Sequence, residues 1–317
     1  MMADDAKAPV GIVGAGLVGL GWTIVFARAG HPVRVYDESP AADTLLARAA
    51  ACLGDLAEFG LIEDVDGPLA RIGTVPTLEE AVGDVGYVQE SVFERVDVKQ
   101  ALFRRLDGAI GGKTIVGSSS SGIPASAFTA GLRHHDRYLI AHPVNPPYLI
   151  PLVEVAPAPW TAPATVDSTM ALMESVGQVP ILVRKEVEGF VLNRLQGALL
   201  REAWALFEEG YASVADIDRT VAHGLGYRWS FMGPFETIDL NAPKGVRDYA
   251  ERLGALYLSI ARDRTDPRPW SEDLVTAVEA ERRAALPADR LGERSRWRDR
   301  RLMALAAHKR DLAGKAS

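Results

Sequence analysis

His142 and Glu154 are the two titratable residues whose positions suggest chemistry most directly. His142 ends the apolar run 138–141 and precedes Pro143, so it stands where a strand stops and a rigid turn begins. Glu154 lies inside the apolar run 150–155, and a carboxylate in such a strand needs a polar partner. If Glu154 holds one imidazole nitrogen, it fixes the tautomer and stabilises the imidazolium that forms when the other nitrogen accepts a proton. The pair predicts a general base, and the same residues also fit a structural histidine and an edge-strand glutamate.

A run of serines and a lone asparagine are further candidates for the same site. Ser118–Ser121 follow a strand expected at 114–117, and Asn193 lies early in a helix expected to begin near Gly189. Because ligands bind outside the carboxyl ends of the strands in open α/β sheets, residues that follow a strand are candidates for ligand contact. Taken alone, the serines also fit a flexible loop and Asn193 an ordinary polar residue of a first helical turn. No spacing typical of a metal site surrounds His142 and Glu154.

The pattern GxGxxG, formed by Gly14, Gly16 and Gly19, lies between an expected strand and an expected helix. The first glycine permits a tight turn, the second lets the backbone approach a pyrophosphate, and the third allows close packing of the helix on the sheet. The pyrophosphate would lie on the free amide groups that begin the helix, at Leu17 and Val18, where the helix dipole also favours negative charge. The motif therefore predicts a dinucleotide site.

Asp37 indicates NAD as the dinucleotide. It stands at the end of the second expected strand, 37 − 19 = 18 residues after the last glycine of the motif, where an acid can accept hydrogen bonds from both ribose hydroxyls. A 2′-phosphate would be repelled there, so we expect NAD rather than NADP, although the neighbouring Arg34 weakens this preference. FAD is a second alternative, but the chain lacks the further motifs and the length of a typical flavoprotein.

The elements that must position these residues indicate an α/β fold, with a Rossmann-type, doubly wound sheet followed by an all-α domain. Short β-branched runs alternate with helical patterns through the first half, which is typical of βαβ units and a mainly parallel sheet. After Gly189 the apolar residues keep helical spacing and no strand pattern recurs. We expect an NAD-binding domain at residues 1–187 and an all-helical domain at residues 188–317. The expected strands are 9–13, 32–36, 71–75, 86–89, 114–117, 138–141, 152–155 and 180–183.

The composition is that of an ordinary globular protein, with 48% hydrophobic and 24% charged residues. The 35 Lys and Arg against 42 Asp and Glu give a formal net charge of −7, and the lysines are scattered, which argues against nucleic acid and anionic membrane as partners. Val10–Ala27 has no charged residue and approaches the length of a bilayer span, but its glycines argue for a strand, a turn and a buried helix. A single cysteine, Cys52, excludes an internal disulfide and favours a reducing, cytoplasmic compartment.

Together these motifs resemble the 3-hydroxyacyl-CoA dehydrogenase superfamily, and within it the lambda-crystallin branch, whose enzymatic activity is that of an L-gulonate 3-dehydrogenase. The resemblance covers nearly the whole chain, and a set of runs in this order is far more specific than a lone glycine motif. The runs are GAGLVG (14–19), SSSSGIPAS (118–126), AHPVNPPYLIPLVEV (141–155), GFVLNRLQ (189–196) and GPFETIDLN (233–241).

The resemblance implies the roles of the site residues. His142 would transfer the proton with Glu154 as its partner, while Ser121 and Asn193 would bind the reacting oxygen. The implied reaction is the reversible, NAD-dependent oxidation of a 3-hydroxy acid to the 3-keto acid.

Two further residues, Glu94 and Lys99, match the family's additional NAD contacts. On the residues alone, this stretch also fits an exposed helix start. The family fold is a Rossmann domain with a helical second domain that dimerises, so the resemblance also implies a homodimer.

The superfamily leaves the substrate open among L-gulonate, 3-hydroxyacyl-CoA, carnitine and hydroxy intermediates of aromatic polyketides. In acyl-CoA enzymes the helical segment after the second strand helps to hold the CoA, whose phosphates favour positive charge. Here one basic residue, Arg48, stands against seven acids in that segment: Glu38, Asp43, Asp55, Glu58, Glu63, Asp64 and Asp66. The serine run also has Ser119 and Gly122 where the acyl-CoA pattern usually has an asparagine and a second polar residue. Both features favour a small polar acid such as L-gulonate.

Arg228 is a candidate for the carboxylate of that acid, across a dimer interface, and the alternative is an arginine that stacks on Trp229. Members of the lambda-crystallin branch can also accumulate as structural proteins with little catalytic demand. Retention of five residues argues instead for a working enzyme: Asp37, Ser121, His142, Glu154 and Asn193.

Overall fold

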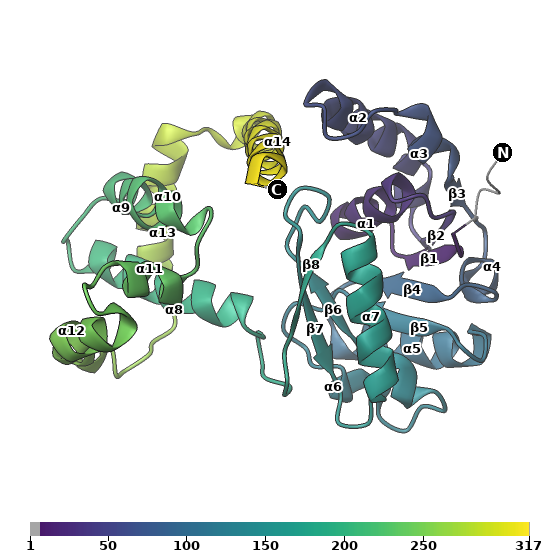
Figure 1. Cartoon of the computed structure of the whole chain (residues 1–317), viewed down its shortest axis with the longest axis horizontal. Coiled ribbons are helices and arrows are strands. Elements are labelled where there is room, and N and C mark those ends of the chain that lie inside the picture. Colours follow the sequence, from purple (N-terminus) through teal and green to yellow (C-terminus); the bar gives the residue numbers. More distant parts are fainter. Residues whose placement is uncertain (1–6, 317) are drawn as a thin grey trace. The chain divides into compact units, whose positions relative to one another are not determined.

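The computed structural model describes residues 7–316, whose course is shown in Figure 1. These residues form two compact units. The first contains the chain up to Arg194 together with the segment from Ser295 onward, and the second is Leu195–Arg294. The first unit is built on a β-sheet with flanking helices, whereas the second contains helices and loops only. The predicted fold class, a Rossmann-like sheet followed by a helical domain, is therefore confirmed.

One sheet forms the centre of the first unit. Its eight strands lie in the order β3-β2-β1-β4-β5-β6-β7-β8, so the chain winds in both directions from β1. The strands from β1 to β6 pair in parallel, β7 pairs antiparallel with β6, and β8 pairs in parallel with β7. The strands are β1 (Val10–Val13), β2 (Val33–Tyr36), β3 (Ile72–Thr74), β4 (Tyr87–Glu90), β5 (Ile115–Ser118), β6 (Tyr138–Pro143), β7 (Leu152–Pro157) and β8 (Val179–Leu182).

Helices connect the strands and cover both faces of the sheet (Figure 1). Because parallel strands cannot be joined by tight turns, each connection carries a helix or a long loop. The helices of this part are α1 (Leu17–Arg28), α2 (Leu45–Glu58), α3 (Asp66–Ala70), α4 (Leu78–Val82), α5 (Val96–Ala109), α6 (Ser126–Thr129) and α7 (Pro163–Ser175), with short 3₁₀ turns at Pro40–Ala42 and His135–Arg137.

Two apolar cores hold the helices against the sheet. On one face, Trp22 of α1, Leu53 of α2 and Met173 of α7 are fully buried in one cluster with the strand residues Val10 and Ile12. On the other face, α4, α5 and α6 contribute a second cluster, whose members include Leu78, Phe103, Phe128, Val13 and Val88. A sheet covered on both faces explains why its strands are continuous apolar runs rather than alternating ones.

The last helix, α14 (Leu291–Ala316), packs largely with the first unit. Met303 is buried in the core cluster that contains α1 and α2. Arg300 of α14 forms ion pairs with Asp55 and Glu58 of α2. The expected second domain ran from residue 188 to the end of the chain, whereas the structure assigns the segment from Ser295 onward to the first unit. A few apolar residues on a highly charged helix pack this segment against the sheet domain. Most side chains of α14 are exposed, so the rest of the helix presents a charged face to solvent.

The second unit is entirely helical. Its elements are the remainder of α8 (Leu192–Glu208), α9 (Val214–Thr220), a π-helical turn (Val221–Leu225), α10 (Gly226–Trp229), α11 (Pro234–Leu240), α12 (Gly245–Arg262), α13 (Glu272–Ala285) and a 3₁₀ turn (Ala288–Arg290). Within it, only Thr237 and Leu274 are buried, so most of its apolar side chains retain exposed surface. Across residues 7–316, no helix combines the length and apolar character that a bilayer crossing requires.

Candidate active site

His142 and Glu154 lie directly opposite each other on the antiparallel strands β6 and β7. Opposite residues of an antiparallel pair project from the same face, and here His142 Nδ1 lies 2.8 Å from Glu154 Oε2. Both side chains are buried. Because an ionised carboxylate can only accept, the neutral form of the imidazole carries its proton on Nδ1 and its lone pair on Nε2. The arrangement can therefore accept a proton at Nε2 and stabilise the resulting imidazolium.

The second oxygen of Glu154 is held by the start of helix α8. The N–H groups of Val191 and Leu192 donate to Glu154 Oε1 at 2.8 and 2.9 Å. Burial alone would raise the pKa of Glu154, but the hydrogen bonds from His142, Leu192 and Val191 outweigh it, so the pKa of this carboxyl lies below its ordinary value. Glu154 therefore stays ionised at neutral pH although water does not reach it.

A left-handed turn brings these amide groups to Glu154. Gly189 and Phe190 both have positive φ, 73° and 48°, and the latter is unfavourable for a residue with a side chain. Phe190 is fully buried, and its ring centroid lies 5.7 Å from that of His142. The packing of Phe190 compensates for the strained backbone, and the same turn closes one side of the imidazole.

Ser121 and Asn193 are also brought together. Asn193 Nδ2 donates to the backbone carbonyl of Ser121 at 2.7 Å, so the contact uses the serine backbone and leaves its hydroxyl uninvolved. The serine loop is tied in turn to the strand of His142. Gln89 Nε2 donates to Ser119 Oγ and to Ala141 O, at 2.8 and 3.1 Å.

Ser119 belongs to the serine run predicted to lie at the site and departs there from the acyl-CoA pattern. In the structure its hydroxyl is the meeting point of three side chains. Trp22 Nε1 donates to it at 3.1 Å, Gln89 Nε2 donates at 2.8 Å, and the Ser91 hydroxyl lies 2.9 Å away. Ser119 is thus a structural anchor of the loop, and the polar groups that converge on it come from α1, β4 and the following loop.

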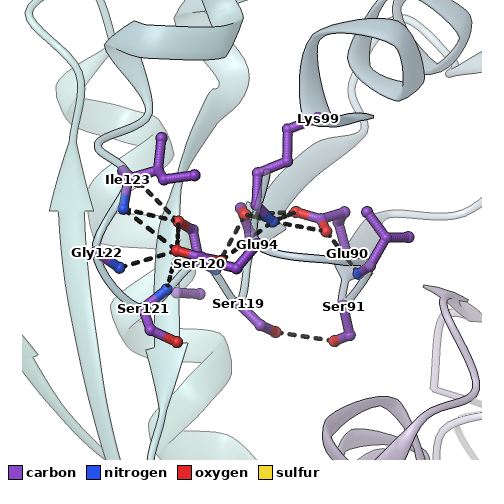
Figure 2. A network of polar contacts seen from close by, with 12 residues as sticks. Glu90, Ser91, Glu94, Lys99, Ser119, Ser120, Ser121, Gly122 and Ile123 are labelled. Atoms are coloured by element: carbon purple, nitrogen blue, oxygen red, sulfur yellow. Dashed lines mark hydrogen bonds and ion pairs between the residues drawn. The ribbon is translucent and has the colours of Figure 1, made fainter. Parts of the chain in front are cut away.

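Glu94 and Lys99 belong to one network of polar contacts, drawn in Figure 2. Lys99 is 1% exposed and forms an ion pair with Glu90 at 2.9 Å, whereas the Glu94 side chain keeps 41% of its surface exposed. The interpretation of this stretch as an exposed helix start is therefore wrong for Lys99. Glu90, which also lies fully buried, was missed because its partner stands on another element.

The glycine loop has the geometry that a dinucleotide requires. Gly14 has φ +104°, and a Cβ there would lie 2.6 Å from Ser91 O, so only glycine fits this turn. A Cβ on Gly19 would lie 1.8 Å from Gly14 O, whereas a Cβ on Gly16 would meet open space. Among residues 7–316, no side chain caps the start of α1, and its first turn carries no acid. The amide groups at Leu17 and Val18 are thus left for an anion, and these residues fit the pyrophosphate of NAD.

Asp37 lies beside this loop. Its carboxylate accepts hydrogen bonds from the N–H groups of Ala15 and Ser39, the latter at 2.7 Å, which fixes it at the carboxyl end of β2. Arg34, which weakened the expected preference for NAD, is paired with Asp84 instead. Arg48 also reaches the loop and donates to Ala15 O at 3.0 Å. In the sequence, Arg48 entered only the count of charges.

The acidic surface after β2 is less negative than its own residues suggest. Arg105 of α5 pairs with Glu38, and Arg300 of α14 pairs with Asp55 and Glu58. These arginines lie far away in the sequence, so a count over 38–70 could not include them. This surface therefore disfavours a phosphate-rich substrate less strongly than its own acids suggest.

Comparison with known proteins gives the family. Residues 9–187 match the 3-hydroxyacyl-CoA dehydrogenase, NAD binding domain, and residues 189–286 match the 3-hydroxyacyl-CoA dehydrogenase, C-terminal domain. The chain belongs to the 3-hydroxyacyl-CoA dehydrogenase family. This is a family of NAD-dependent hydroxyacyl dehydrogenases, so the predicted cofactor, NAD, and the predicted family are confirmed.

Several relatives within this family are similar over most of their length. Lambda-crystallin of Oryctolagus cuniculus is 40% identical over 317 residues, which cover 98% of this chain and 99% of that protein. L-carnitine dehydrogenase of Streptomyces griseus is 41% identical over 244 residues, or 77% of this chain and 72% of that protein. Among solved structures, an NAD⁺-dependent 5-formyl-3-hydroxy-2-methylpyridine 4-carboxylic acid 5-dehydrogenase has a TM-score of 0.79 and 31% identity, covering 94% of this chain and 97% of its own.

Arg228, the candidate for a substrate carboxylate, belongs to the second unit, where it lies on α10. The other predicted site residues, from Gly14 to Asn193, belong to the first unit. The role of Arg228 toward a substrate stays a prediction.

Proposed function

We propose that this protein is an NAD-dependent 3-hydroxy acid dehydrogenase in which His142 is the general base. The observation that carries the proposal is the buried His142–Glu154 pair on β6 and β7, in which Glu154 Oε2 lies 2.8 Å from His142 Nδ1 and leaves Nε2 to face a reacting group. A base of this kind can take the proton of a secondary hydroxyl as the carbonyl forms. When bound, NAD⁺ supplies the hydride acceptor for the hydrogen on that carbon.

Glu154 would act by holding the protonated imidazole. Its Oε2 accepts from His142 Nδ1, and this hydrogen bond strengthens when the ring becomes cationic. Because Val191 and Leu192 fix the other oxygen, the carboxylate cannot turn away during the reaction. Ser121 and Asn193 would hold the reacting oxygen, Ser121 through its hydroxyl and Asn193 through its amide group.

For the substrate we propose a small polar 3-hydroxy acid, with L-gulonate as the first candidate. The full-length similarity to lambda-crystallin supports this choice, as does the departure of the serine run from the acyl-CoA pattern at Ser119 and Gly122. Arg228 is proposed to meet the carboxylate across a dimer interface. The variant Arg228→Ala should then raise KM for the acid and leave the affinity for NAD unchanged, and an unchanged KM would exclude this role.

L-carnitine is the second candidate, because the similarity to L-carnitine dehydrogenases is as high as that to lambda-crystallin, although it covers less of the chain. A 3-hydroxyacyl-CoA and a polyketide intermediate remain the wider alternatives within the superfamily. A crystallin-like structural protein is the non-enzymatic alternative.

The test is NADH formation from NAD with L-gulonate, L-carnitine and a 3-hydroxyacyl-CoA in parallel, at alkaline pH, where release of the hydroxyl proton is favoured. We expect turnover of L-gulonate in preference to the other two. Turnover of the CoA ester alone would overturn the small-acid assignment, and a lack of turnover with all three would favour a specialised substrate or the structural alternative.

We also propose that the second unit forms a homodimer. In residues 195–294 only Thr237 and Leu274 are buried, and a helical unit with so little core needs a partner surface. Large apolar side chains exposed there include Phe231, Phe235, Leu240, Leu256, Tyr257 and Trp270. Light scattering on the purified chain should give twice the 34.2 kDa mass of one subunit, and a monomer at micromolar concentration would contradict this.

A further inference from the structure

The ammonium group of Lys99 is enclosed within the protein. Its Nζ lies 2.9 and 3.0 Å from the two oxygens of Glu90, 3.5 Å from Ser118 Oγ and 3.8 Å from Glu94 Oε2. Lys99 and Glu90 are 1% and 0% exposed. A buried charge of this kind persists only when it is paired and hydrogen-bonded. Its partners are Glu90 on β4, Glu94 in the loop after β4 and Ser118 on β5.

Glu94 carries the network onward to the serine loop. While Oε2 faces Lys99, Oε1 accepts from the Ser120 hydroxyl at 2.7 Å and from the N–H groups of Ser121, Gly122 and Ile123 at 2.9, 3.0 and 3.3 Å (Figure 2). Successive backbone N–H groups that converge on one oxygen form a concave anion site. Here the anion is a side chain of the protein itself, and it fixes the backbone of the loop.

The loop in turn fixes Asn193, because the Ser121 carbonyl accepts from Asn193 Nδ2. A continuous series of contacts thus runs from Glu90 through Lys99 and Glu94 to the two residues proposed to bind the reacting oxygen. We propose that Glu90 and Lys99 are positioning residues, which act through Glu94 on Ser121 and Asn193 and do not bind the cofactor with the Lys99 charge. This inference rests on the proposed function for its effect on turnover.

The distribution of charge supports this assignment. Two carboxylates share one ammonium, and the Lys99 side chain is enclosed, so its charge is already matched within the protein. Of the three charged residues, Lys99, Glu90 and Glu94, it is Glu94 whose side chain is exposed to solvent. If the Lys99 charge is removed, Glu94 loses its ionic partner and water competes for its oxygens. The loop amides at residues 121–123 then lose their common acceptor.

The test uses a double substitution, because Lys99→Met alone would leave Glu90 buried without its counter-ion and could prevent folding. In Glu90→Gln/Lys99→Met both charges are removed together, and the glutamine oxygen can still accept from the Val92 N–H that now binds Glu90 at 2.7 Å. The matched control is Glu79→Gln/Lys113→Met, which removes one acid and one lysine at exposed positions.

Two measurements do not require turnover. Amide hydrogen exchange should show faster exchange at residues 121–123 in the Glu90/Lys99 double variant and in Glu94→Ala, and wild-type rates in the control. Glu94→Gln should restore part of the protection, since its amide oxygen can still accept. The dissociation constant for NAD, measured by tryptophan fluorescence, should stay within about threefold of wild type in the Glu90/Lys99 double variant.

The third measurement is turnover of whichever hydroxy acid the wild type accepts. Because displacement of positioning groups by about 1 Å can cost around 10²-fold, we expect kcat to fall roughly 10–100-fold in the Glu90/Lys99 double variant and to remain unchanged in the control. A tenfold or greater loss of NAD affinity with unchanged exchange at 121–123 would overturn the inference and make Lys99 a cofactor contact. If the wild type turned over no hydroxy acid while the exchange pattern followed expectation, the proposed function alone would fail.

Discussion

His142 and Glu154 differ in how firmly the protein holds them. Glu154 is fixed at both oxygens, by His142 and by the amide groups of Val191 and Leu192. His142 is held at Nδ1 and against the ring of Phe190, which leaves Nε2 for a reacting group. The carboxylate is therefore the rigid partner, and the imidazole is the group whose charge changes during the proposed reaction.

Replacement of His142 separates chemistry from cofactor binding. In His142→Ala, kcat should fall about 10²–10⁴-fold, which is the typical contribution of a general base, while the affinity for NAD stays near wild type. Steady-state kinetics and fluorescence titration with NAD check the two halves of this prediction. Unchanged turnover would remove His142 from the mechanism.

Glu154 makes the stability of the protein dependent on pH. Its pKa is lowered in the folded state, so its ionised form stabilises the fold at all pH values above the ordinary value of 4.5, and this contribution is lost as the pH falls through the lower folded pKa. Glu154→Gln should cost about 1.5–3 kcal/mol of unfolding free energy at neutral pH, as expected for hydrogen bonds to a charged group. Urea unfolding of both proteins between about pH 3 and pH 7 tests the sign. The difference should shrink toward acid, and a constant difference would contradict the role of the charge.

At the level of secondary structure, the glycines of the turn between β1 and α1 have different roles. Gly19 is needed for packing, because a Cβ would lie 1.8 Å from Gly14 O, whereas Gly16 faces open space. The variant Gly16→Ala should keep its unfolding free energy within about 1 kcal/mol of wild type but weaken NAD binding, since the new methyl group occupies the path of the pyrophosphate. Gly19→Ala should instead lower the thermal unfolding temperature strongly. Equal stability of the two variants would refute this division.

Site residues could be predicted from the sequence where a single strand or βαβ unit contains the whole motif. The glycine motif and Asp37 lie on one βαβ unit, and the end of β6 marked His142, so local patterns sufficed. They did not suffice for Lys99, whose burial depends on Glu90 at the end of β4 and Ser118 at the end of β5. An apolar run also does not reveal the direction of its strand. The antiparallel pairing of β7, which sets Glu154 opposite His142, could therefore be seen only in the structure.

At the level of the whole chain, α14 was the least predictable element. It is rich in arginine, which is typical of a solvated face, yet Met303 is buried in the core of the first unit. Met303→Ala should cost about 2–5 kcal/mol of unfolding free energy, as for other large-to-small core substitutions. The control on the same helix is Leu305→Ala, at a side chain that is 39% exposed, which should change stability by about 0.5 kcal/mol or less. Equal effects in urea unfolding would show that α14 does not stabilise the sheet domain.

Because α14 returns to the sheet domain, Leu195–Arg294 is an insertion within a unit whose two parts are separated along the chain. During synthesis, the eight strands leave the ribosome well before the helix that completes the core around α1 and α2. While the inserted helices are synthesised, the apolar surface of α1 and α2 that later packs against Met303 is therefore uncovered. Such an area is a site where a chaperone binds or chains associate. The order of translation, rather than the stability of the finished fold, therefore sets the period in which this protein is most prone to aggregate.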